Sequence, residues 1–251
     1  MAKIEPVELR RLEAAPEDSE SQRARELADT PEARKLKVKL AAGYRILARY
    51  GMDQGVAGHI SLRVPGAPDY FWVNPFGLQF GQVSADQLVL VNHHGQHVDG
   101  WPVVNYAAFC IHGAIHHARP DVHCAAHTHS AAGSAFSALN IPLEPLDQVC
   151  CSFFEDHAVY SEYDGVVVDM DQTRGMVETL GRARAMILSN HGLLTCAETV
   201  EQAVIDMIDL DRSCDLNLRA MATGTVQDVA VGRFAVWLVY PYEQACEAAS
   251  R

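Results

Sequence analysis

Two histidines separated by a single residue, His127 and His129, are the feature of the sequence best suited to chemistry. They end the apolar run at residues 122–127, which predicts a buried strand, and residues two apart on a strand point to the same side. His191 follows a second strand-like run at residues 185–189. Three neutral imidazoles can hold one divalent cation and leave a coordination position open for a substrate oxygen, so these residues are candidate ligands of a catalytic metal.

A structural role for the same residues is the alternative. Imidazoles on a buried strand can be satisfied by backbone carbonyl groups, and two histidines at this spacing do not by themselves decide between the two roles. A second cluster, His93, His94 and His97, lies in a predicted turn between two strands. An exposed hairpin lacks the walls that fix metal geometry, so we predict no metal there.

The elements that must position these residues alternate along the chain. Thr30 and Pro31 are typical of a helix start, and the apolar spacing behind them predicts a helix that ends near Gly51. Further predicted elements are β-rich runs within 56–92, helices at 105–118, 130–139 and 199–224, and strands at 122–127 and 186–189. This alternation predicts one α/β domain over residues 31–251, preceded by a flexible arm at residues 1–30.

The composition excludes several classes of partner. The chain has 251 residues, with 20 basic and 32 acidic side chains and a formal net charge of -12, which repels nucleic acid and anionic membranes. No apolar run reaches the roughly 18 residues that a membrane-spanning helix needs, and residues 1–11 do not resemble a signal peptide. Seven cysteines without CxxC spacing are typical of a reducing compartment. We therefore predict a cytoplasmic protein that acts on a small molecule.

Four short motifs in a fixed order carry a family resemblance. They are Gly-His-Ile-Ser-Leu-Arg at 58–63, Asn-Pro-Phe-Gly at 74–77, Ala-Arg-Pro-Asp-Val-His-Cys-Ala-Ala-His-Thr-His-Ser at 118–130 and Asn-His-Gly-Leu-Leu at 190–194. With them, the chain resembles the class II aldolase/adducin family over about residues 33–224. The resemblance implies a three-layer α/β/α sandwich with a mostly antiparallel central sheet, usually assembled as a homotetramer with active sites between subunits.

The same resemblance assigns the metal ligands. It implies that His127, His129 and His191 hold one divalent metal ion per subunit, which agrees with the argument from strand geometry. Zinc is the first expectation, and manganese or iron are the alternatives.

The chain departs from the sugar-phosphate aldolases of that family at two places. Those enzymes place a catalytic glutamate nineteen residues before the first metal-binding histidine, and this position is Ala108. Their phosphate loops are rich in hydroxyl groups, whereas Phe76 and the valines at 103–104 offer none. The region resembles instead the adducin-like branch, which includes the non-enzymatic adducin head and relatives that act as decarboxylases or oxygenases. We therefore expect an anionic substrate without a phosphate group.

Several residues are candidates for the missing base and for substrate binding. His112 lies one helical turn after Ala108 and is the first candidate for the base, with a structural histidine as the alternative. His157 and Glu155 are further catalytic candidates, and a solvated loop is the alternative for them. The candidate substrate-binding residues are His59, Arg63, Asn74 and Gly77, with an ordinary salt bridge as the alternative for Arg63.

The leading functional prediction is a divalent-metal-dependent lyase. It would act by aldol-type cleavage or decarboxylation on a small, non-phosphorylated hydroxy or keto acid or carbonyl compound. A non-haem iron oxygenase that uses the same histidines is a second prediction. A non-catalytic, adducin-like interaction module is the third; Ala108 favours it and the intact set of histidines opposes it. We expect a homo-oligomer, with neither nucleic acid nor a membrane as a partner.

Overall fold

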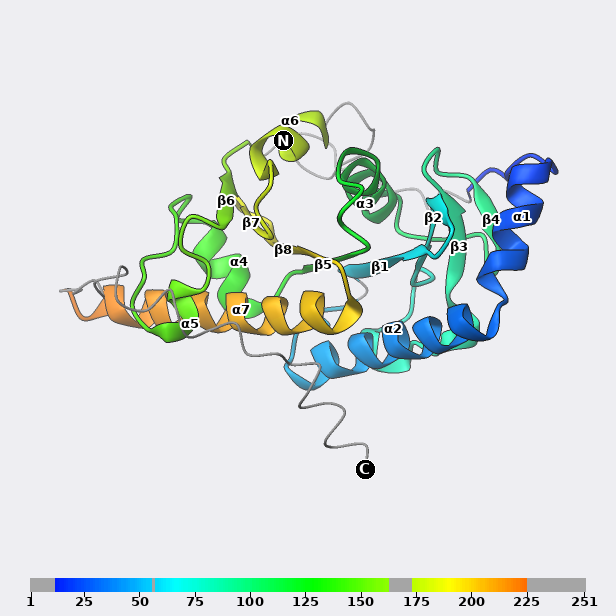
Figure 1. Cartoon of the computed structure of the whole chain (residues 1–251). Helices are drawn as coiled ribbons and strands as arrows, with labels where there is room; N and C mark the ends of the chain where they lie inside the picture. The colour runs from blue at the N-terminus through cyan, green and yellow to red at the C-terminus, as the bar shows by residue number, and fades with distance from the viewer. Residues whose placement is uncertain (1–11, 56, 163–172, 225–251) are drawn as a thin grey trace, which may run out of the picture.

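A computed structural model describes residues 12–55, 57–162 and 173–224, and an eight-stranded sheet runs through the middle of this part of the chain (Figure 1). The strand order is β4-β3-β2-β1-β5-β8-β7-β6, and every neighbouring pair is antiparallel except β6 with β7. The strands are β1 (His59–Val64), β2 (Ala67–Val73), β3 (Val89–Asn92), β4 (His97–Asp99), β5 (Cys124–Thr128), β6 (His157–Tyr160), β7 (Ala185–Leu188) and β8 (Gly192–Ala197). The predicted mostly antiparallel sheet is confirmed.

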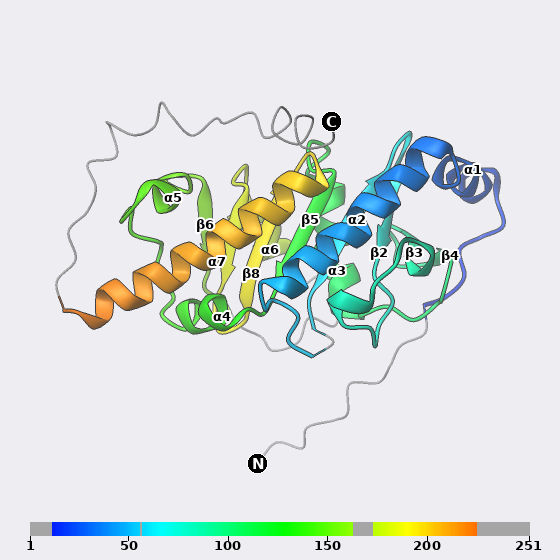
Figure 2. The same ribbon diagram turned by 90° about the horizontal axis from the view of Figure 1, so that it is seen from below.

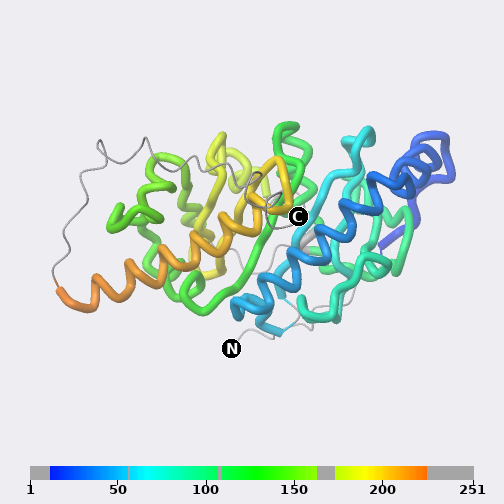
Figure 3. Tube along the Cα trace, turned by 60° about the horizontal axis from the view of Figure 1, so that its bottom comes forward, coloured from blue at the N-terminus to red at the C-terminus, as the bar shows by residue number. Residues whose placement is uncertain are grey.

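Helices cover both faces of this sheet and give the predicted three-layer α/β/α sandwich. The long helices α2 and α7 lie side by side across one face (Figures 2 and 3), and α3 and α6 lie on the other (Figure 1). The helices are α1 (Ser19–Ala28), α2 (Pro31–Arg49), α3 (Tyr106–Ala118), α4 (Ala131–Ser137), α5 (Gln148–Cys151), α6 (Arg174–Leu180) and α7 (Val200–Ala222), with short 3₁₀ turns η1 (Phe80–Gln82) and η2 (Ala85–Gln87). Each face of the sheet has its own hydrophobic core.

The helices α2 and α7 begin where the sequence predicts their caps. The hydroxyl groups of Thr30 and Thr199 each accept a hydrogen bond from a backbone N–H in the first turn, and Pro31 occupies the first helical position of α2. The two helices approach closely at Gly43, where a Cβ atom would lie 3.0 Å from the side chain of Val204. Their packing covers the sheet face opposite α3.

Alternation along β1 divides its side chains between the two faces. Ile60 and Leu62 belong to the core under α2 and α7. His59, Ser61 and Arg63 point to the other face, where they contact residues of α3. A line of polar side chains is therefore buried between β1 and α3, next to the strand that carries the predicted metal ligands.

The described part of the predicted N-terminal arm differs from the expectation of weak packing. Helix α1 packs at the β4 end of the sheet, where Ala24 is completely buried and Arg25 donates to the carbonyl oxygen of Val98. Ahead of it, the backbone N–H of Ala15 donates to the carbonyl oxygen of His97 at 2.8 Å. The buried residues of α1 are only Ser21 and Ala24, so the helix shows no apolar stripe in the sequence. Residues 1–11 and 225–251 lie outside the described residues, and the domain limits at 31 and 251 stay a prediction.

The strands β6 and β8 and the helix α6 were not predicted from the sequence. Of the described cysteines, all six are free and five are buried. Within the described residues, no helix combines the length and the apolar character needed to cross a membrane.

Candidate metal centre

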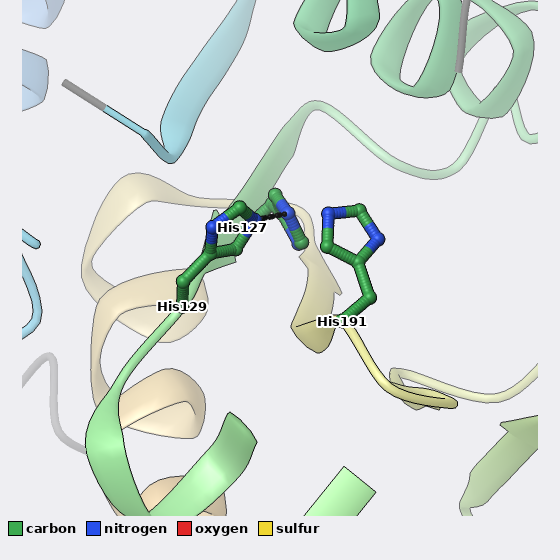
Figure 4. A group of neighbouring side chains, drawn as sticks. All are labelled: His127, His129 and His191. Carbon is green, nitrogen blue, oxygen red and sulfur yellow. Dashed lines mark hydrogen bonds between the residues drawn. The ribbon is translucent and has the colours of Figure 1, made fainter. Parts of the chain in front are cut away.

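The three histidines predicted as metal ligands lie together at the adjacent ends of β5 and β8, in the middle of the sheet. His127 and His129 stand at the end of β5, His191 lies in the turn between β7 and β8, and their rings face one another (Figure 4). The three ring centroids are 4.6 to 4.7 Å apart, and one nitrogen from each ring lies within 4.8 Å of the other two. Nε2 of His127 and Nε2 of His129 are only 2.8 Å apart.

Two backbone features bring His191 to the end of β5. Asn190 has a φ of 54°, in the left-handed region that asparagine tolerates better than most residues. At Gly192, a Cβ atom would lie 2.3 Å from the carbonyl oxygen of Thr128 and 3.1 Å from the ring of His129. Only glycine allows β8 to start this close to β5, so the Asn-His-Gly sequence presents the third histidine to the other two.

The outer nitrogen of His127 determines which side of its ring faces the other histidines. Nδ1 of His127 donates to the carbonyl oxygen of Leu193 at 2.8 Å. Because a carbonyl oxygen can only accept, the proton of the neutral ring is on Nδ1 and Nε2 keeps its lone pair. That lone pair is directed towards His129, as a metal-binding nitrogen requires.

Burial keeps the three imidazoles neutral. It lowers the pKa of His127 well below the ordinary value, and the neighbouring histidines lower it further. Burial also lowers the pKa of His129, and together with the nearby His129 it lowers the pKa of His191 to about 4. Neutral imidazole is the form that binds a metal ion.

These observations fit a divalent cation. Three neutral nitrogens from two separate segments converge, and the central ring is oriented by a backbone carbonyl. A divalent cation held by only three protein ligands would keep a position open for a substrate oxygen. Among residues 12–55, 57–162 and 173–224, no other set of three or more histidine, cysteine, aspartate or glutamate side chains is close enough to hold a metal.

A second group of histidines is buried beside this centre, between β1 and α3. Nδ1 of His59 lies 2.8 Å from Nε2 of His112, whose Nδ1 lies 2.6 Å from Oγ of Ser61. Oγ of Ser61 in turn lies 2.7 Å from Nε2 of His116. The ring of His59 is 4.9 Å from the ring of His127, so His59 is the member of the group that borders the metal centre.

His112, the first candidate for the missing base, contacts His59, which borders the metal centre. It is completely buried, and both of its ring nitrogens are engaged, one by His59 and the other by Ser61. Burial lowers its pKa to about 3. This position suits a residue that orients His59 and not one that touches a substrate. Sequence reasoning missed Ser61, although it lies two residues after His59 on a strand and therefore on the same side.

Asn74 and Gly77 frame a loop next to β1. Asn74 is buried, and its Oδ1 accepts a hydrogen bond of 2.8 Å from the hydroxyl of Tyr44, which holds the end of β2 against α2. Gly77 is exposed and has a φ of 94°, which a residue with a side chain rarely adopts. The loop between them lines a groove of about 370 Å³ together with Trp101. The structure thus gives Asn74 an anchoring contact and leaves Gly77 at the surface.

Arg63 is in a different environment from the one predicted. Its guanidinium donates to the backbone carbonyl oxygens of His116, Val122 and Arg119 at 2.7, 3.0 and 3.2 Å, and also to Pro68. It stands at the opposite end of β1 from His59. Arg63 therefore holds the loop after α3 through backbone carbonyls, and its predicted contact with a substrate carboxylate stays a prediction.

His157 and Glu155 are not brought to the metal centre either. His157 begins β6 at the edge of the sheet, where its Nε2 accepts from the backbone N–H of Leu143 at 3.0 Å and its Nδ1 donates to the carbonyl oxygen of Phe153 at 2.6 Å. Glu155 is exposed in the preceding turn, with a φ of 56°. Within this chain, His157 ties two loops together and Glu155 forms part of the solvated turn that was the alternative.

Comparison with known families agrees with this arrangement. The model of the Class II Aldolase and Adducin N-terminal domain matches residues 38–218, which is most of the chain. The protein therefore belongs to the class II aldolase/adducin family, as the motifs implied.

Individual relatives bear names of several activities. The chain is 40% identical over 196 residues, covering 77% of itself and 71% of the relative, to a 4-hydroxy-3-prenylphenylpyruvate oxygenase/4-hydroxy-3-prenylbenzoate synthase from Streptomyces roseochromogenus subsp. oscitans. It is 39% identical over 196 residues, with coverage of 77% and 73%, to decarboxylase NovR from Streptomyces niveus. Among solved structures, an L-fuculose 1-phosphate aldolase from Glaciozyma antarctica PI12 superposes with a TM-score of 0.76 at 37% identity, covering 84% of this chain and 85% of the other.

Proposed function

We propose that the protein is a divalent-metal-dependent lyase that breaks a carbon-carbon bond next to a carbonyl group, by aldol-type cleavage or decarboxylation. The observation that supports this most directly is the convergence of one nitrogen each from His127, His129 and His191, with His127 oriented by the carbonyl of Leu193. When bound there, a divalent cation acts as a Lewis acid that stabilises negative charge on a substrate oxygen. Zinc is the expected ion, with manganese or iron as the alternatives.

The residues of the chain have separate tasks in this proposal. The three histidines of the metal centre hold the cation and leave a position for the carbonyl oxygen of the substrate. In either reaction the fragment with the carbonyl group would keep the electron pair of the broken carbon-carbon bond, the other fragment would leave as carbon dioxide or as a carbonyl compound, and a proton would take its place on carbon. His59 borders the centre and is the nearest additional polar side chain of β1.

The substrate is proposed to be a small hydroxy or keto acid, or a carbonyl compound, without a phosphate group. The loop that would face a phosphate contains Phe76, whose backbone N–H is already bonded to the carbonyl oxygen of Val103 at 2.9 Å. Val104 is buried and offers no hydroxyl group. This loop therefore offers fewer donors than a dianionic phosphate needs. The name of the relative NovR, a decarboxylase, supports an acid as the substrate.

An iron-dependent oxygenase is a second candidate, because the relative with 40% identity bears the name of an oxygenase. The same three imidazoles can bind Fe(II) with positions to spare. A non-catalytic interaction module is a weaker candidate, since a module of that kind has no use for three convergent neutral imidazoles at a buried strand end.

The test combines elemental analysis with substrate screening. Purified protein is analysed for zinc, manganese and iron and then incubated with small hydroxy and keto acids, with and without oxygen. We expect about one divalent ion per chain and release of carbon dioxide or a carbonyl product under anaerobic conditions. Turnover that consumes oxygen and requires iron would replace the lyase by the oxygenase. Protein that neither retains nor takes up a divalent ion would overturn both.

Oligomeric state and location stay predictions from the sequence. A homotetramer with active sites between subunits is expected, and light scattering of the purified protein measures the mass. A cytoplasmic location is checked by cell fractionation.

A further inference from the structure

The buried histidines between β1 and α3 form a hydrogen-bonded chain whose far end is fixed by the backbone. Nδ1 of His116 lies 3.2 Å from the carbonyl oxygen of Val122. A carbonyl oxygen has no proton to give, so Nδ1 of His116 must be the donor. If the ring is neutral, its other nitrogen, Nε2, has only a lone pair, and it lies 2.7 Å from Oγ of Ser61.

The direction of each further bond follows from the one before. The single hydroxyl proton of Ser61 is used in donating to His116, so Oγ must accept from Nδ1 of His112 at 2.6 Å. Nε2 of His112 is then unprotonated and accepts from Nδ1 of His59 at 2.8 Å. The proton of neutral His59 is therefore on Nδ1, and its Nε2 keeps a lone pair.

Neutrality of the three rings is the condition for this argument, and burial provides it. His59, His112 and His116 are 2%, 0% and 2% exposed. Burial is the largest cause that lowers the pKa of each, to about 3 for His112 and well below the ordinary value for the other two. A proton added anywhere along the chain would leave two donors facing each other or a buried charge without a counterion.

We infer that the chain from Val122 through His116, Ser61 and His112 fixes His59 as the tautomer whose Nε2 is a hydrogen-bond acceptor at the wall of the metal centre. Among the described residues, no group donates to this nitrogen, and the ring lies 4.9 Å from that of His127. The partner that such a nitrogen selects is a hydroxyl group on the substrate. A carboxylate oxygen would meet it lone pair to lone pair, so His59, a candidate substrate-binding residue from the sequence, would bind the substrate through an O–H group.

This inference rests on the proposed function only for the identity of the ligand, a hydroxylated small molecule beside the metal. It favours substrates that carry a hydroxyl group beside their carbonyl or carboxylate group over simple keto acids. Ser61, His112 and His116 are positioning residues in this scheme, because they act only through His59.

Nitrogen NMR of the histidine side chains tests the tautomers directly. The protein is labelled with ¹⁵N-histidine and loaded with zinc, and long-range proton-nitrogen spectra are assigned with His59→Gln, His112→Gln and His116→Gln variants. We expect all three rings to carry the proton on Nδ1. A protonated Nε2 on His59 would overturn the inference. The same spectra of the metal-free protein separate it from the proposed function, because the tautomers are expected there even if no metal binds.

Two variants distinguish the chain from ordinary packing. Ser61→Ala removes the group that links His116 to His112, so the signals of His59 should move towards those of a mixture of tautomers. Ser213→Ala removes another buried serine hydroxyl, which donates to the carbonyl oxygen of Asp209 on α7, and should leave the His59 signals unchanged. Unchanged His59 signals in a folded Ser61→Ala protein would show that the chain does not set the tautomer.

The ligand class is tested with glycolate and acetate, which differ by one hydroxyl group. We expect glycolate to shift the Nε2 signal of His59 in the zinc-loaded protein and to bind at least several-fold more tightly than acetate. His59→Phe should remove this difference. Equal responses to the two acids, including no response to either, would contradict the assignment of a hydroxyl group.

Discussion

The histidine clusters of the β3–β4 hairpin and of the metal centre differ in how firmly their rings are held. In the β3–β4 hairpin, the rings of His93 and His94 are 3.8 Å apart, closer than any two rings of the metal centre. His94 is nevertheless exposed, and His97 donates from Nε2 to the carbonyl oxygen of Gly100 in its own turn. The nitrogens of this hairpin do not converge into a metal-binding group.

The metal centre differs in what holds its rings. His127 is buried on a central strand with its outer nitrogen bonded to Leu193, and His191 is held against β5 by the close approach at Gly192. Ring proximity alone is therefore a poor sign of a site. Rigid strands, a shared buried wall and a carbonyl behind the ring are what fix the direction of a nitrogen lone pair.

The largest expected effect follows from removing one ligand from each region. His127→Ala should lose nearly all bound metal and all metal-dependent activity, because it removes the central nitrogen of the three. His94→Ala should retain about one ion per chain. Elemental analysis after gel filtration measures both. If the hairpin variant also lost its metal, the distinction between the two regions would fail.

The next effect concerns the pH dependence of stability in the metal-free protein. The pKa of His112 is lowered to about 3 by burial, whereas in the unfolded chain it is ordinary, about 6.5. Below pH 6.5 the unfolded state binds a proton that the folded state does not, so stability falls as the pH drops from 6.5 towards 3. Each such group contributes a slope of up to about 1.4 kcal/mol per pH unit.

The variant His112→Gln should reduce this slope by up to about 1.4 kcal/mol per pH unit, the contribution of one proton. The free energy of unfolding is measured by urea denaturation with a chelator between pH 8 and pH 4.5. At pH 8 the histidine is neutral in both states, so the difference there reports packing alone. A slope equal to that of the unmodified protein would mean that His112 is protonated in the folded state, against the burial observed here.

A smaller effect is expected from closing the space at the third ligand. In Gly192→Ala the new methyl group would meet the carbonyl of Thr128, so β8 must shift, at a cost of about 1–3 kcal/mol of stability and weaker metal binding. Gly81→Ala is the matched control, because its Cβ would meet only Ala48 at 3.7 Å. Urea unfolding and zinc titration measure both. Equal stability of the two variants would show that the close approach of β8 to β5 does not require glycine at position 192.

The smallest effect concerns a histidine that belongs to neither region. His157→Ala removes the acceptor for Leu143 and the donor to Phe153, which should lower stability by about 1–2 kcal/mol. Metal content and kcat/KM of the folded fraction should stay within a few-fold of the original. A large loss of kcat/KM with normal metal content would instead support the predicted catalytic role of His157.

The sequence by itself determined the parts of this protein that depend on local rules. The two-residue spacing of His127 and His129 at a strand end, the caps at Thr30 and Thr199, and the order of the motifs are all read within one segment. The mostly antiparallel sheet followed from the family resemblance. Helix α1 was not predicted, because its buried residues are small and do not produce a pattern of hydrophobic periodicity.

Only the tertiary structure decided which polar residues face one another. His112 and His59 are 53 positions apart, and their 2.8 Å contact exists because α3 packs across β1. Tertiary packing also places the guanidinium of Arg63 against backbone carbonyl oxygens. It places His157 between two loops, where its ring bonds the backbone of each. Periodicity tells which side of its own element a residue occupies, but the identity of the partner depends on which element covers that side, and this is set by the packing of the whole chain.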